Sequence, residues 1–149
     1  MAYLCLDCYE TYKIPLQNCP KTSCNGHVVE IDELMLPTII LLNQKGYHTE
    51  FCCAGHIYET SGHCYPYIVF DSSLNEMLDD DEFKEIFKEL PECWCIEEGD
   101  WLNRKTLRCQ IENDNVENDN VIEVQKMICY ANLKLLDFVD TLPSLYDEE

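Results

Sequence analysis

Four cysteines near the amino terminus restrict the fold more than any other feature of the sequence. They form two pairs, separated by two and by four residues: Cys5 and Cys8, then Cys19 and Cys24. Two tight turns supplied by neighbouring hairpins can place four soft ligands around one ion, and zinc prefers four such ligands in a tetrahedron. The spacing therefore predicts a zinc ribbon over residues 1–30, with one structural zinc ion bound by all four cysteines.

The residues around the two pairs favour the same small unit. Short strands are expected at residues 9–14 and 27–31, where side chains alternate in character. Gly26 follows the second pair, where it would let the chain turn without a Cβ clash. His27 is an alternative ligand, but its position favours a strand residue.

The cysteine content as a whole favours a reducing compartment. The chain has 11 cysteines, an odd number, and its start has neither a basic region nor a long apolar stretch. A secreted disulfide framework is therefore the weaker interpretation, and metal binding and burial the stronger one. No apolar run reaches the roughly 18 residues that a membrane span requires. We expect a soluble, cytoplasmic protein.

The charge of the chain restricts its partners. It carries 29 acidic and 10 basic residues, for a formal net charge of −19. Such a chain repels phosphate backbones, so direct binding of nucleic acid is disfavoured. The simplest role for the acidic surface is to keep the protein soluble. The more specific alternative is contact with a basic protein partner.

The rest of the chain predicts an α+β core domain over residues 31–149, following the ribbon. Its core is a mainly antiparallel sheet of about four strands, with three helices packed on it. Hydrophobic periodicity and turn residues place the strands at 47–54, 65–71, 93–98 and 105–111, and the helices at 32–46, 79–90 and 120–141.

Some boundaries in this domain have specific signals. Asp32 is a candidate N-cap for the first helix, although Pro37 can delay the helix start to Leu36. Gly46 is a suitable residue just after its end. Residues 72–78 are expected to form a loop. A tandem repeat over 112–121 is expected to form a polar loop that leads into the last helix.

A second group of cysteines and histidines lies where two predicted strands meet. Cys52, Cys53, His56, His63 and Cys64 fall within 13 residues. Neighbouring strand residues point to opposite faces, so Cys52 and Cys53 are not expected to bind one ion together.

Three interpretations of this group stay open. Cys53, His56, His63 and Cys64 form a candidate second zinc site or the rim of a pocket. Alternatively, Cys53 is a catalytic thiol activated by His56. The simplest interpretation is a turn after a core strand, with Gly55 present for its backbone freedom.

One stretch carries a resemblance to known proteins. The run Ile39-Ile-Leu-Leu-Asn-Gln-Lys-Gly-Tyr-His-Thr-Glu-Phe-Cys-Cys-Ala-Gly-His56, followed by Tyr67-Ile-Val-Phe70, resembles small uncharacterised zinc-ribbon proteins of bacteria and their phages. In that pattern a serine stands where this chain has Ala54. The likeness covers residues 3–70, and the family brings no assigned activity.

The functional prediction is a non-enzymatic zinc-ribbon binding or adaptor protein with an acidic surface that faces its partner. Two alternatives belong to other classes. One is an enzyme whose site is the cluster at residues 52–64, and the other is an acidic phage-type inhibitor that mimics nucleic acid through its charge.

Overall fold

The computed structural model describes residues 2–57, 63–97, 104–109 and 121–146. These residues form an α+β fold, as the sequence predicts. The strands are β1 (Ala2–Cys5), β2 (Thr11–Tyr12), β3 (Val28–Ile31), β4 (Thr49–Cys53), β5 (His56–Ile57), β6 (His63–Cys64), β7 (Tyr67–Phe70), β8 (Trp94–Glu97) and β9 (Thr106–Cys109). The helices are α1 (Leu36–Gln44), α2 (Ser73–Met77), α3 (Asp80–Ile86) and α4 (Val121–Asp140).

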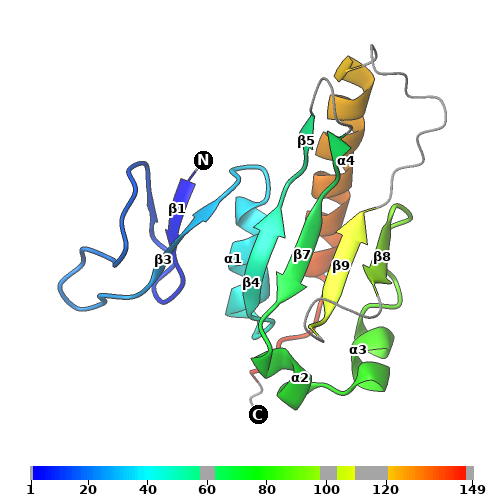
Figure 1. Cartoon of the computed structure of the whole chain (residues 1–149). Coiled ribbons are helices and arrows are strands. Elements are labelled where there is room, and N and C mark those ends of the chain that lie inside the picture. Colours follow the sequence, from blue (N-terminus) through cyan, green and yellow to red (C-terminus); the bar gives the residue numbers. More distant parts are fainter. Residues whose placement is uncertain (1, 58–62, 98–103, 110–120, 147–149) are drawn as a thin grey trace.

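The first three strands form an antiparallel sheet of their own, the N-terminal sheet, in the order β2-β1-β3. It lies beside the main body, on the side of β4 (Figure 1). Successive side chains of a strand point to opposite faces. Leu4 accordingly belongs to the main hydrophobic core, whereas Cys5 packs in a small separate core with Cys19 and Val28. Ile31, at the end of β3, also enters the main core, so the N-terminal sheet contributes to both.

The main sheet has the order β4-β7-β9-β8, and all neighbouring strands are antiparallel. β7 has a partner on both sides, a central position that suits a strand with apolar residues on both faces. The strands predicted at residues 93–98 and 105–111 are confirmed and pair as a hairpin, with Trp94 opposite Cys109. A short β5-β6 ladder continues from the β4 and β7 pair.

Helix α1 begins at Leu36, as expected if Pro37 delays it, but Asp32 is not its N-cap. Met35 holds that position and makes no side-chain cap. The Asp32 carboxylate instead accepts a hydrogen bond from the Ala54 amide at 2.8 Å. Gly46 follows the C-cap with φ +99°, as predicted for a residue that leaves the helix in the left-handed region.

The predicted second helix forms, but it is shorter than expected. Asp79 caps α3 in a reciprocal capping box with Glu82, and the acidic residues of the first turn open the helix. The helix ends at Ile86 rather than at Leu90. Phe87 leaves the helical conformation. Its ring is buried against that of Phe83, and the two ring centroids are 4.5 Å apart.

Residues 72–78 contain the short helix α2 rather than only a loop. Leu74 is buried in the main core. This burial stabilises a short helix that the polar residues around Leu74 do not predict. The tandem repeat of residues 112–121 lies almost entirely outside the described residues.

Helix α4, the last of the predicted helices, has an apolar stripe. Its buried members, with a step of three or four residues, are Ile128, Ala131, Leu135 and Val139, and Leu142 continues the stripe just past the helix end. α4 and α1 cover the same face of the main sheet (Figure 1), so the stripe packs against the core of its own chain. In the described part of the chain, no helix is both long enough and apolar enough to cross a membrane.

Lys45 joins the end of α1 to the end of α4. Its Nζ donates hydrogen bonds to the carbonyl oxygens of Val139, Asp140 and Leu142 at 2.9, 2.9 and 2.7 Å. The last carbonyls of a helix have no intrahelical partner and carry partial negative charge. The ammonium group therefore satisfies the C-terminal end of α4 from a different element.

We expect Lys45→Met to lower the free energy of unfolding by about 1.5–3 kcal/mol, the usual contribution of hydrogen bonds to a charged group. Urea unfolding followed by circular dichroism measures the change. Lys88→Met is the control, because Lys88 is exposed and pairs with Glu85 on the surface of the same segment. Equal stability changes in the two variants would contradict this role for Lys45.

Candidate metal centre

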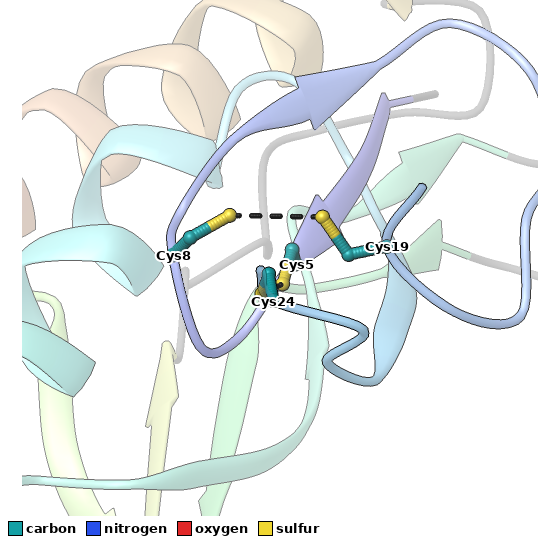
Figure 2. A group of neighbouring side chains, drawn as sticks. All are labelled: Cys5, Cys8, Cys19 and Cys24. Carbon is teal, nitrogen blue, oxygen red and sulfur yellow. Dashed lines mark hydrogen bonds between the residues drawn. The ribbon is translucent and has the colours of Figure 1, made fainter. Parts of the chain in front are cut away.

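The four cysteines of the predicted pairs lie together at one end of the N-terminal sheet. Their sulfur atoms are all within 4.8 Å of one another. The Sγ atoms of Cys5 and Cys24 are 3.5 Å apart, and those of Cys8 and Cys19 are 3.7 Å apart (Figure 2). A disulfide requires about 2.05 Å between sulfurs, and all four are free thiols. We name this group the cysteine cluster.

The cysteine cluster has the dimensions of a metal site. Four sulfurs held tetrahedrally at about 2.3 Å from zinc lie about 3.8 Å from one another. The two separations of 3.5 and 3.7 Å are close to this edge length. Cys5 and Cys19 are buried, and Cys8 and Cys24 are half-buried. The cluster could therefore hold a metal ion with all four ligands drawn from the chain.

Backbone amides donate hydrogen bonds to the sulfur atoms of the cysteine cluster. The Asp7 amide donates to Cys5 Sγ at 3.4 Å, two residues along the chain. The same two-residue step recurs at the other three cysteines, with backbone hydrogen bonds from Glu10 to Cys8, from Lys21 to Cys19 and from Gly26 to Cys24. Each of these bonds acts to lower the pKa of its thiol, but the pKa is lower than usual only at Cys19 and is raised at Cys8 and Cys24. A hydrogen bond to the charged form stabilises that form, and metals bind cysteine as the thiolate.

Two left-handed residues give the turns their shape. Tyr9 and Asn25, with φ of 63° and 55°, directly follow the second cysteine of each pair. Asparagine tolerates the left-handed region more readily than most residues. The prediction that Gly26 avoids a Cβ clash is confirmed: a Cβ there would lie 2.4 Å from Asp7 Oδ2 and 2.7 Å from Asp7 Cβ.

Tyr12 is a neighbour of the cluster that the cysteine spacing did not predict. Its hydroxyl lies 3.1 Å from Cys19 Sγ, and this hydrogen bond lowers the pKa of Cys19 to about 7. Burial acts in the opposite direction at Cys24 and raises its pKa to about 12. The only sequence signal for Tyr12 is its place on a strand that leads toward Cys19.

The second predicted group is only partly described. The β5-β6 ladder places His56 opposite Cys64 and Ile57 opposite His63, which brings the backbones together. The side chains of His56, His63 and Cys64 lie outside the described residues, so a second metal site stays a prediction.

The described cysteines of this region are in enclosed surroundings. Cys53 is 7% exposed, and its sulfur accepts a hydrogen bond from the Gly55 amide at 3.4 Å. Burial raises the pKa of Cys52 to about 12, which disfavours its thiolate near neutral pH.

Two residues whose role was not predicted from the sequence, Asp32 and Asn132, form hydrogen bonds to the backbone of the turn that follows Cys53. Asp32 accepts from the Ala54 amide, and the Asn132 side chain donates to the Ala54 carbonyl at 3.1 Å. Asn132 is 2% exposed, and its Oδ1 has no hydrogen-bond partner within the described ranges. A polar residue beside the buried stripe of α4 is the signal that could have identified it.

Comparisons with protein-family models, curated proteins and solved structures give no match to this chain. The residues and their geometry therefore carry the functional argument.

We expect Tyr12→Phe to weaken metal binding by about tenfold or more, the effect typical of losing a hydrogen bond to a ligand, without changing the stoichiometry. Competition with a chromophoric chelator measures the affinity. Tyr3→Phe is a matched control, because Tyr3 lies directly opposite Tyr12 in the same sheet and also loses only a hydroxyl. Unchanged affinity in Tyr12→Phe would show that the 3.1 Å contact does not stabilise the bound thiolate.

Proposed function

We propose that this chain is a non-enzymatic binding protein whose N-terminal sheet is held by one structural zinc ion. The observation that carries the proposal is the set of four cysteine sulfurs within 4.8 Å of one another. Four protein ligands complete a tetrahedral site and leave no position for water or substrate, whereas catalytic zinc sites keep one position open. Bound zinc would thus stabilise the fold rather than activate a reactant.

The N-terminal sheet has little else to hold it together. Among the described residues, the buried members of its separate core are Cys5, Cys19 and Val28, and two of these are proposed ligands. Small units of this kind often fold only with their metal. Because Leu4 and Ile31 of the same sheet enter the main core, loss of the ion should also weaken the attachment of the sheet to the rest of the chain.

The described thiols near residue 53 support a binding protein over a thiol enzyme. A nucleophilic cysteine needs access to substrate and a low pKa, whereas Cys53 is buried and burial raises the pKa of Cys52. The resemblance to small zinc-ribbon proteins of bacteria and phages supports the same proposal. Free thiols also suit a cytoplasmic location, where cysteines stay reduced.

We expect elemental analysis to find one zinc ion per chain. Cys24→Ser should lose the ion and unfold at lower urea concentration, because the remaining three sulfurs cannot complete the tetrahedron. Cys129→Ser is the matched control, since Cys129 is an exposed thiol on α4, outside the cysteine cluster. Full zinc retention by Cys24→Ser would refute the assignment.

A Cys53→Ala/His56→Ala double variant tests the second predicted site. If the cysteine cluster is the only zinc site, the double variant keeps the same metal content as the unchanged chain. Two zinc ions per chain that fall to one in the double variant would establish a second site.

A further inference from the structure

A groove of about 800 Å³ runs between α4 and the segment that joins α3 to β8. Its apolar lining comes from both sides: Cys93 from the segment before β8, and Met127, Tyr130 and Phe138 from α4. The α4 residues are spaced by three or more positions and form a second stripe, next to the buried one. Tyr130 is 61% exposed, so a large aromatic surface stays available at this groove.

The walls of the groove are fixed by contacts to the core. Trp94, at the start of β8, donates from its indole Nε1 to the Ala131 carbonyl of α4 at 2.9 Å. On the α3 side, the rings of Phe87 and Phe138 pack with centroids 5.7 Å apart. These contacts hold both sides in place without an occupant, and a pre-organised groove loses less entropy when it binds.

The charged groups of the groove are mostly acidic. Glu89, Glu92 and Asp137 line it and are exposed, against a single cation, Lys134. Lys134 lies over the Tyr130 ring, with Nζ 5.4 Å from its centroid, so its charge is directed to that ring. An apolar floor with carboxylates at its rim complements a segment that carries both apolar anchors and positive charges.

We propose that this groove docks a basic amphipathic segment of a partner protein, with an apolar side chain against Tyr130 and lysine or arginine side chains on the rim carboxylates. The inference deepens the proposed binding function and rests on it. The net charge of −19 favours the same sign of partner. Residues 112–119 of the chain itself carry four acidic and no basic side chains, so charge disfavours them as the occupant.

The test uses the zinc-loaded full chain and a fluorescent amphipathic peptide of about 15 leucine and lysine residues. Fluorescence anisotropy in about 0.15 M salt measures its affinity. We expect Tyr130→Ala to weaken binding by about fivefold or more, as for an aromatic anchor. Leu133→Ala, which truncates another exposed residue of α4 outside the groove, should change it by less than about twofold.

A second pair of variants separates the groove from the overall charge. The groove variant combines Glu89→Gln, Glu92→Gln and Asp137→Asn. The control combines Glu30→Gln, Glu76→Gln and Asp81→Asn, which removes the same charge from exposed sites outside the groove. The groove variant should weaken binding by about fivefold or more relative to the control.

Several results would overturn the proposal. The first two are equal loss of peptide affinity in the two charge variants and equal effects of Tyr130→Ala and Leu133→Ala on that affinity. The third is that a peptide of leucine and glutamate binds as tightly as the peptide of leucine and lysine. The fourth is self-association of the chain that Tyr130→Ala abolishes. Zinc content is measured on the same samples. If the unchanged chain holds zinc but does not bind the peptide, the result contradicts the groove proposal alone. If the unchanged chain holds no zinc, the result contradicts the structural zinc site.

Discussion

Four thiols within 4.8 Å of one another bring together the two turns of residues 5–24. Ionising several thiols so close together is unfavourable, because each negative charge raises the pKa of the others. A bound cation reverses this balance and turns the repulsion into attraction. Strand β1 links the cluster to the main core, because its successive side chains point to opposite faces. Cys5 faces the cluster, and the adjacent Leu4 enters the main core. Metal binding at the cluster would therefore be coupled to packing of the N-terminal sheet through neighbouring residues.

Helix α4 has a comparable role in the main body. Three elements contact its polar groups: Trp94 of β8 bonds to the Ala131 carbonyl, Lys45 after α1 bonds to the helix end, and Asn132 of α4 bonds to the turn at Ala54. These contacts join a helix near the end of the sequence to three segments far from it in the chain. They also fix the rotation of α4, which sends one stripe into the core and leaves the adjacent stripe along the groove.

Local signals in the sequence were sufficient for the fold class, the β8-β9 hairpin and the buried stripe of α4, because periodicity reports which face is buried. They failed where a residue far away in the sequence determines what a side chain binds. Asp32 has the residue type and position of an N-cap, but its carboxylate accepts a hydrogen bond from the Ala54 amide, 22 residues away. The spacing of the cysteines brought out the candidate metal site, since their turns are local. Tyr12 could not be found in this way, because its contact with Cys19 depends on how two separate segments pack.

Charge connects the metal site with the groove only weakly. Zinc held by four thiolates has a net charge of about −2, so the bound ion would not offset the acidity of the chain. The N-terminal sheet lies beside β4 (Figure 1). The groove is lined in part by Glu92 and Cys93, which directly precede β8, the strand at the opposite edge of the main sheet. Four strands spaced about 4.8 Å apart separate these edges by about 14 Å, which exceeds the screening length of about 8 Å at physiological salt. The overall charge would then speed the approach of the proposed basic partner, but its docking place would depend on the local carboxylates Glu89, Glu92 and Asp137.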